Sequence, residues 1–319
     1  MSEVKRALIS VSDKTGLPEF AKELVTLNVE IFASGGTAKL LSDQDIPVHD
    51  IAEYTGQGEM LGGRVKTLQP RLHAGILAKR ENPEHMRELD ENAIVPIDLV
   101  VVNLYPFEAK VSATTTQDEA MEWVDIGGEA LIRAAAKNFS SVGVIVNPED
   151  YELVLSEIRA TGAISNETAH GLARKAFKHV ARYNAVISQW FDADLQLPEV
   201  LTAVEERERE LRYGENPHQR AALYSTRTEL RQLQGKGLSY VNVLDSEAVV
   251  KCVREFSDPT AVIVKHTSPC GAASSDSLES AFRKAYEADS LSDFGGIIGL
   301  NRELDAYTAK LIAEHFFEV

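Results

Sequence analysis

Short apolar runs alternate with segments of helical periodicity along the first half of the chain. The runs that we interpret as buried strands are residues 7–11, 29–33, 99–103 and 142–146, with a shorter extended piece at 47–51. Apolar residues recur on one face of a helix over 17–27, and residues 37–41 start a second helix. Strands that alternate with helices favour a doubly wound α/β fold with a parallel sheet.

Two segments interrupt this alternation. Residues 54–70 form a glycine-rich stretch with little periodicity, which is too long for a simple connection between two elements. Residues 168–191 carry apolar side chains at helical spacing over their whole length. We expect a long helix here, which packs across the domain or against a partner subunit.

A second pattern begins near residue 200, so we expect two domains, at residues 1–200 and 201–319. Residues 205–210 are a charged run, which we interpret as a solvated connector. The elements expected after it are an extended piece at 222–224, helices at 246–256 and 278–288, a strand at 261–264 and a glycine-rich apolar run at 295–300. Residues 316–319 are typical of a strand with nothing after it to cover one face, so we expect an incomplete second domain.

The charge and composition of the chain limit its partners. The 319 residues carry a formal net charge of −16, which disfavours nucleic acid and anionic membranes as partners. Two cysteines, Cys252 and Cys270, are typical of free thiols in a reducing compartment. The N-terminal residues do not resemble a signal peptide, and no apolar run approaches the roughly 20 residues of a membrane helix. We therefore expect a cytoplasmic protein.

Two turns that follow predicted strands are rich in hydroxyl groups and glycine. The candidate residues of the first turn are Ser10, Ser12 and Lys14, and those of the second are Ser34, Gly36 and Thr37. Parallel strands end at one edge of their sheet, where the N–H groups of the following helices bind anions. The pattern therefore predicts a phosphate site. The alternative is that these residues only cap a helix and close a tight turn.

A cationic loop follows at residues 62–67. If this loop is extended, Arg64 and Lys66 point to the same side, with Thr67 next in the chain. Two cations and a hydroxyl group could neutralise a phosphate or stabilise a developing oxyanion. The alternative is a solvated basic loop.

The remaining candidates of the first domain lie at the starts and ends of later elements. Asn103 and Tyr105 follow a predicted strand, while Asp125, Gly127 and Gly128 open a helix predicted over 129–138. A carboxylate at that position is stabilised by the helix dipole, and glycines expose N–H groups, although capping alone would also explain the pattern. Lys137 lies near the far end of the same helix, where cations are common.

Residue spacing argues against several common sites. The histidines do not fall at zinc-ligand spacing, and Pro269-Cys270 lacks the second cysteine of a zinc-deaminase motif. Neither turn matches a Walker motif, no dinucleotide fingerprint follows a strand, and no Gly-x-Ser-x-Gly elbow is present. We predict no metal site, and no cofactor for the first domain.

Taken together, these segments resemble the PurH family of bifunctional purine-biosynthesis proteins, which carry AICAR transformylase and IMP cyclohydrolase activities. The matching motifs are residues 10–14 (SVSDK), 33–38 (ASGGTA), 59–68 (EMLGGRVKTL), 103–107 (NLYPF), 125–128 (DIGG), 133–138 (RAAAKN), 212–219 (RYGENPHQ) and 264–266 (VKH). The likeness spans the whole chain. Several motifs in a fixed order are far more specific than any one of them.

The resemblance implies a methylglyoxal-synthase-like fold for residues 1–200 and an IMP cyclohydrolase there, a hydrolase acting on cyclic amidines. Such an enzyme closes the formylated ribonucleotide FAICAR to IMP with loss of water. On this basis we expect the residues of the two turns to bind phosphate, and Arg64, Lys66, Thr67 and Asn103 to line the base end. We expect Asp125 to hold or deprotonate the carboxamide. Lys66, Tyr105 and Lys137 are candidates to stabilise the oxyanion or help water leave.

Residues 201–319 resemble the N-terminal part of the transformylase domain, and we expect an incomplete cytidine-deaminase-like α/β domain. That activity uses 10-formyltetrahydrofolate as co-substrate. The resemblance implies that Lys265 and His266 form its proton-transfer pair and that Arg212 and Tyr213 contact AICAR. We expect useful transformylase activity only in a full-length chain, and a homodimer as in relatives.

Two rival functions stay open on the sequence alone. A methylglyoxal-synthase-type phosphate lyase could share the sheet and the phosphate turns. A regulatory module could bind IMP without turning it over. The cationic loop, together with Asp125 and Lys137, favours catalysis over binding alone.

Overall fold

The computed structural model describes residues 3–225, 231–289 and 291–319, and the chain divides into two compact units. The first unit is Met1–Ala203 and the second is Val204–Val319. The expected boundary near residue 200 lies beside this division. Each unit has its own sheet and its own apolar core.

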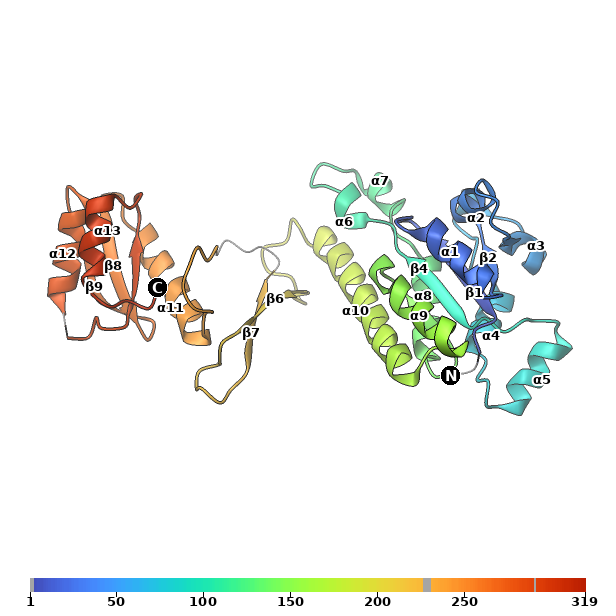
Figure 1. Ribbon diagram of the computed structural model, residues 1–319. Coiled ribbons are helices and arrows are strands. Elements are labelled where there is room, and N and C mark those ends of the chain that lie inside the picture. The colour runs from blue at the N-terminus through green and yellow to red at the C-terminus, as the bar shows by residue number, and fades with distance from the viewer. Residues whose placement is uncertain (1–2, 226–230, 290) are drawn as a thin grey trace. The chain divides into compact units, whose positions relative to one another are not determined.

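A five-stranded parallel sheet forms the centre of the first unit (Figure 1). Its strands are β1 (Arg6–Val11), β2 (Glu30–Ala33), β3 (His49–Asp50), β4 (Leu99–Asn103) and β5 (Gly143–Ile145). Their spatial order is β3-β2-β1-β4-β5. The chain therefore builds outward from β1 to β3 and then crosses to the other side of β1. In open α/β sheets, ligands bind beyond the carboxyl ends of the strands at this reversal point.

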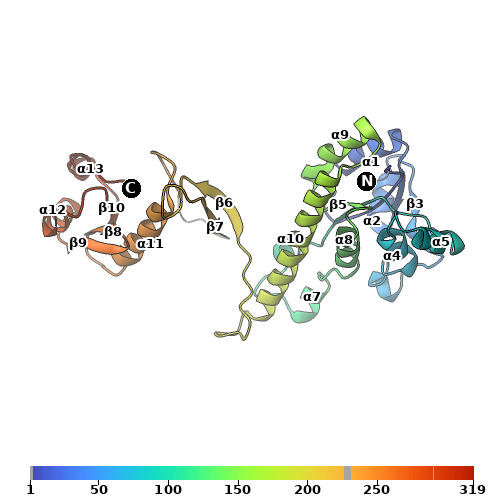
Figure 2. The ribbon, with the colours of Figure 1, turned by 90° about the horizontal axis from the view of Figure 1, so that it is seen from below.

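Helices cover both faces of this sheet (Figure 2). The helix α1 (Leu17–Thr26) packs on β2 and α9 (Tyr151–Thr161). On the opposite face, α8 (Gly127–Lys137) packs on β4 and β5, and α10 (Asn166–Phe191) and α4 (Pro70–Leu77) pack against α8. The other helices are α2 (Gly35–Ser42), α3 (Ile51–Thr55), α5 (Pro83–Glu91), α6 (Phe107–Lys110), α7 (Gln117–Met121) and the 3-10 turns η1 (Leu61–Gly63) and η2 (Pro148–Asp150). The doubly wound α/β fold is confirmed.

The strands and the long helix of the first unit agree with their predicted ranges within a few residues. At two places the structure refines the predicted ranges. Residues 47–51 contain only the two-residue strand β3, because Ile51 already begins α3. Residues 54–70 are not a plain loop, since they contain the end of α3, the turn η1 and a bridge between Met60 and Val65.

The second unit contains two antiparallel sheets. The strands β6 (Glu206–Leu211) and β7 (Ala221–Ser225) form a two-stranded sheet, and β8 (Thr260–Lys265), β9 (Ser268–Ser274) and β10 (Ile297–Leu300) form the order β10-β8-β9. The helices are α11 (Tyr240–Arg254), α12 (Leu278–Ala288) and α13 (Ala306–Ala313). Alternate residues of β8 point to opposite faces: Ala261 and Ile263 join the core with α12 and α13, while Val262 and Val264 pack with α11.

Three predictions for the second unit are corrected. Residues 205–210 are not a connector, since most of them form the strand β6. The helix α11 begins six residues earlier than predicted, at Tyr240, after a capping box between Ser239 and Asn242. Residues 316–319 form no strand, although their main chain makes three hydrogen bonds with Gly295, Gly296 and Ile298.

No helix in the described parts of the chain combines the length and the apolar character that crossing a membrane requires.

The packing of α4 can be tested at Gly75. A Cβ atom on Gly75 would lie 2.6 Å from the main-chain oxygen of Val95, so Gly75→Ala must displace backbone. We expect a loss of about 1–3 kcal/mol in the free energy of unfolding. Gly171→Ala on α10 is the control, because its Cβ atom would meet nothing within 4 Å, and it should not destabilise.

Urea unfolding followed by tryptophan fluorescence measures both variants. Trp123 and Trp190 are the two tryptophans of the chain, and both lie in the first unit. Equal stability of Gly75→Ala and Gly171→Ala would contradict the close packing of α4.

Candidate functional site

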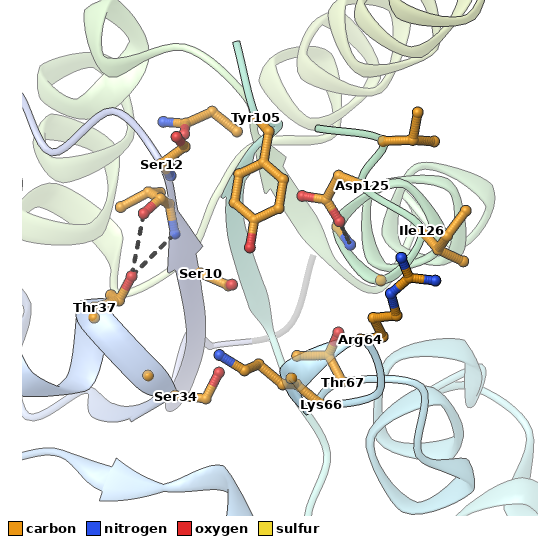
Figure 3. Close-up of a pocket in the computed structure, with 18 of the residues that line it drawn as sticks. Ser10, Ser12, Ser34, Thr37, Arg64, Lys66, Thr67, Tyr105, Asp125 and Ile126 are labelled. Atoms are coloured by element: carbon orange, nitrogen blue, oxygen red, sulfur yellow. Dashed lines mark hydrogen bonds between the residues drawn. The ribbon is translucent and has the colours of Figure 1, made fainter. Parts of the chain in front are cut away.

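A cavity of about 760 Å³ opens at the carboxyl ends of β1, β2 and β4 (Figure 3). It lies at the point where the strand order reverses, as expected for a ligand site in this fold. The predicted site residues that line it are Ser10, Ser12, Lys14, Ser34, Gly36, Thr37, Arg64, Lys66, Thr67, Asn103, Tyr105, Asp125, Gly127 and Gly128. Segments far apart in the sequence thus meet in one place.

Lys137 does not line this cavity. Gly127 and Gly128, at the start of α8, face the cavity, whereas Lys137 is the last residue of the same helix. An 11-residue helix is about 16 Å long at 1.5 Å per residue. Lys137 therefore lies at the far end of α8 from the described cavity, and its expected role stays a prediction.

The two lysines of the cavity flank the N-terminus of α2. The Lys66 ammonium nitrogen lies 3.2 Å from the position that a Cβ atom would occupy on Gly35, and that of Lys14 lies 3.9 Å from the corresponding position on Gly36. Ser34 precedes this helix, and its side chain makes no capping hydrogen bond. Two positive charges and the positive end of a helix dipole therefore meet at one point.

The positions of Arg64 and Lys66 differ in part from the prediction. The loop is not extended, since Arg64 has helical φ and ψ angles of −64° and −24°. Lys66 points toward Ser34, away from Asp125, so its ammonium group lies at the end of the cavity where α2 begins (Figure 3). Arg64 forms an ion pair with Glu122 on the cavity lining.

Thr37 and Asn103 shape the cavity through hydrogen bonds to main chain. The buried hydroxyl of Thr37 accepts from the N–H of Val11 at 3.2 Å and lies 3.3 Å from the carbonyl of Val11, to which it donates. The Asn103 side chain accepts from the N–H groups of Ser12 and Asp13, at 2.6 and 2.8 Å, and donates to the Asp13 carbonyl. These hydrogen bonds hold the turn after β1, and both residues also line the cavity.

Asp125 lies at the other end of the cavity, just before α8. Burial raises the pKa of its carboxyl group, and the nearby Glu129 acts in the same direction. A hydrogen bond of 2.7 Å from the N–H of Gly128 opposes this effect. A buried carboxylate with a raised pKa is a stronger base than an exposed one, so Asp125 is suited to accept a proton.

The glycines at the start of α8 are required by close contacts. A Cβ atom on Gly127 would lie 2.5 Å from Oγ1 of Thr67, and one on Gly128 would lie 2.6 Å from Oδ2 of Asp125. Any larger residue would push Thr67 or Asp125 out of place.

Three functional side chains were missed from the sequence. Tyr183 on α10 accepts a hydrogen bond from the N–H of Asp125 at 2.8 Å and donates to the carbonyl of Trp123. Glu122 pairs with Arg64, and Glu59 pairs with Lys66 at 2.9 Å. Only Glu59 had a possible signal in the sequence, because it is an acidic residue in the same matching motif as the cationic loop.

The candidate residues of the second unit are already engaged within it. The Arg212 guanidinium stacks over the Tyr213 ring, 4.8 Å from its centroid. Lys265 donates to the carbonyl of Phe294 at 2.9 Å. His266 has a positive φ of 52°, and its N–H donates to Asp245 at 3.1 Å.

In the residues that the structure describes, no group of three or more His, Cys, Asp or Glu side chains gathers to hold a metal ion.

Comparison with known proteins first defines the class of the first unit. Residues 16–130 match the family model of the MGS-like domain. Residues 135–319, more than half of the chain, match the family model of the AICARFT/IMPCHase bienzyme. The chain therefore belongs to the AICARFT/IMPCHase bienzyme family. The resemblance stated from the sequence motifs is confirmed.

Individual relatives agree with this assignment. The bifunctional purine biosynthesis protein PurH of Persephonella marina is 48% identical over 327 residues, which cover 99% of this chain and 64% of that protein. The protein of the same name from Bacillus subtilis is 48% identical over 326 residues, with the same coverage of 99% and 64%. The chain thus spans less than two thirds of the length of these relatives.

A solved structure is also similar. The crystal structure of ForH matches with a TM-score of 0.56 and 36% sequence identity, covering 60% of this chain and 98% of that chain.

The role of Asn103 can be tested by removing its amide. Asn103→Ala leaves the N–H groups of Ser12 and Asp13 without their acceptor. We expect a loss of about 2–4 kcal/mol in the free energy of unfolding, since each unpaired group costs about 1–3 kcal/mol. Urea unfolding measures it, with Asn92→Ala at the exposed end of α5 as the control. A stability close to the control would show that Asn103 does not hold the turn.

Proposed function

We propose that the first unit is an IMP cyclohydrolase, which closes FAICAR to IMP with loss of water. The observation that carries this proposal is the separation of charge within one cavity, with cations at one end and a carboxyl group at the other. Two ammonium groups flank the N-terminus of α2, and a partly buried carboxyl group with a raised pKa lies before α8. A ribonucleotide with a phosphate at one end and a carboxamide at the other matches this arrangement. Family membership supports the same reaction.

The phosphate is proposed to bind at the N-terminus of α2. Its charge would be balanced by Lys14 and Lys66, and its oxygens would accept hydrogen bonds from the N–H group of Gly36 and from the hydroxyls of Ser10 and Ser34. Ser12 lines the same part of the cavity. This places the ribose in the middle of the cavity and directs the imidazole ring toward α8.

Ring closure needs correct placement more than a reactive side chain. The carboxamide nitrogen attacks the formyl carbon and loses one proton, which gives a carbinolamine. The formamide nitrogen loses the second proton as the C=N bond forms, and the former formyl oxygen departs as water with both protons. In our proposal Asp125 accepts the proton from the carboxamide nitrogen. The N–H groups of Gly127 and Gly128 hold the base end, and Tyr105 or Arg64 donates to the departing oxygen. Holding two groups of one molecule in contact can supply much of the acceleration.

We further propose that this chain belongs to a larger purine-biosynthesis enzyme that also transfers a formyl group from 10-formyltetrahydrofolate to AICAR. The match of residues 135–319 supports this role for the second unit. Arg212, Tyr213, Lys265 and His266 are the residues that we propose to act there, although the described unit engages them in internal contacts. The homodimer, the cytoplasmic location and the functional boundary near residue 200 stay predictions.

An ultraviolet assay of FAICAR cyclisation by the full chain tests the proposed reaction directly. The match to the MGS-like domain favours one rival, a methylglyoxal-synthase-type lyase. Phosphate release from dihydroxyacetone phosphate separates this rival from the cyclohydrolase. IMP binding without turnover of either substrate would indicate a regulatory module and overturn the proposal.

Asp125→Asn should lower kcat about a hundredfold to a thousandfold, because it removes the proton acceptor and keeps the shape. The pH profile adds a second test. Since burial raises the pKa of Asp125, the wild-type kcat/KM should fall on the acidic side at a pH above the ordinary aspartate pKa of about 3.9. This acidic limb should be missing in the variant. An unchanged limb in Asp125→Asn would assign the proton to another group.

Lys14→Ala should weaken IMP binding about tenfold or more, because it removes one of two charges beside the proposed phosphate. Titration calorimetry measures the dissociation constant. Lys22→Ala, at an exposed position of α1, is the matched control and should bind as the wild type does. Equal affinities of the two variants would place the phosphate elsewhere.

A further inference from the structure

The loop that carries Arg64 and Lys66 is a short hairpin, which we call the cationic hairpin (residues 59–67). Met60 and Val65 exchange both main-chain hydrogen bonds, at 3.0 and 3.2 Å. The turn between them has three consecutive residues with positive φ, of 55°, 65° and 95°. Two of these are Gly62 and Gly63, which adopt such angles at little cost.

This geometry forces Glu59 and Lys66 together. In an antiparallel pair, the residues next to a hydrogen-bonded pair face each other directly, and their side chains are close. Glu59 and Lys66 are the residues that flank the Met60–Val65 bridge. Accordingly, Oε1 of Glu59 lies 2.9 Å from Nζ of Lys66.

The ion pair lies against the N-terminus of α2. Nζ of Lys66 is 3.2 Å, and Oε1 of Glu59 is 3.8 Å, from the position of a Cβ atom on Gly35. The same Nζ atom is 3.6 Å from the corresponding position on Gly63. Lys66 lines the cavity, whereas Glu59 is not among the described residues that line it. Glu59 therefore does not contact the cavity. It can affect a bound phosphate only through the charge and the position of Lys66.

We propose that Glu59 is a positioning residue that fixes the Lys66 ammonium group at the N-terminus of α2. Lysine has a flexible four-carbon side chain, so an unanchored ammonium group would sample many positions. The carboxylate selects one of them. It also cancels much of the lysine charge, which moderates the attraction for phosphate. This inference rests on the proposed function for the identity of the ligand.

The experiment is a double-mutant cycle in the full chain, with IMP affinity from calorimetry and kcat from FAICAR cyclisation. Glu59→Gln should bind IMP about fivefold more tightly, because a repelling charge near the phosphate is lost. Its kcat should fall about tenfold, because Lys66 is no longer held in place. Lys66→Met should weaken IMP binding about tenfold or more, since it leaves the Glu59 carboxylate unpaired.

The double variant gives the decisive readout. Adding Glu59→Gln to Lys66→Met should restore at least fivefold of the lost IMP affinity, as expected when an opposing charge is removed. It should not restore kcat, because the ammonium group is still missing. Glu59→Asp keeps the charge and should lie between the wild type and Glu59→Gln in kcat. Glu88→Gln on the exposed side of α5 is the matched control and should change neither value.

If Glu59 only stabilised the fold, Glu59→Gln would bind IMP with a higher dissociation constant than the wild type. The double variant would then regain none of the affinity that Lys66→Met loses. Either result would overturn the inference. If the wild type binds IMP and the variants show this pattern of rescue, but the wild type does not cyclise FAICAR, only the proposed reaction would be contradicted. Normal cyclisation without rescue would contradict the positioning role alone. A wild-type chain that fails to bind IMP would contradict both.

Discussion

The parallel pairing of β1 with β4 is the constraint on which the site depends. This register sets Val11 opposite Asn103, so the last residue of β4 lies beside the end of β1. The Asn103 amide then binds the main chain of Ser12 and Asp13. These hydrogen bonds fix the path of the turn after β1. The cavity forms beyond the carboxyl ends of β1 and β4, between the segments that follow these two strands. A shift of one residue in this register would separate these groups.

The electrostatics of the cavity contrast with those of the chain. The protein carries a formal net charge of −16, yet the cavity gathers Lys14, Arg64 and Lys66. Two of these cations form ion pairs, with Glu59 and Glu122. The ion pairs are partly exposed, so they contribute little to stability. Their main effect is on where the positive charge is held.

The sequence allowed the sheet edge to be predicted because the alternation of strands with helices and the composition of turns are local signals. Residues separated by almost a hundred positions, such as Ser12 and Asn103, could be assigned to one site from the parallel fold alone. The hairpin geometry could not, because it depends on Leu61 adopting a positive φ, which is unusual for this residue type. The catalytic role expected for Lys137 from the resemblance stays a prediction, since Lys137 lies at the end of α8 and does not line the described cavity. The strand β6 was missed because nearly all of its residues are charged, which hides the alternation of a strand.

The two ends of the cavity differ in how firmly they are built. Tyr183 fastens the main chain around Asp125 to α10, a helix of 26 residues whose inner face belongs to the apolar core. The cationic hairpin packs less firmly, since Leu61 at its tip is 77% exposed. The carboxylate side of the cavity therefore takes its shape from the apolar core, whereas the hairpin side depends on partly exposed ion pairs.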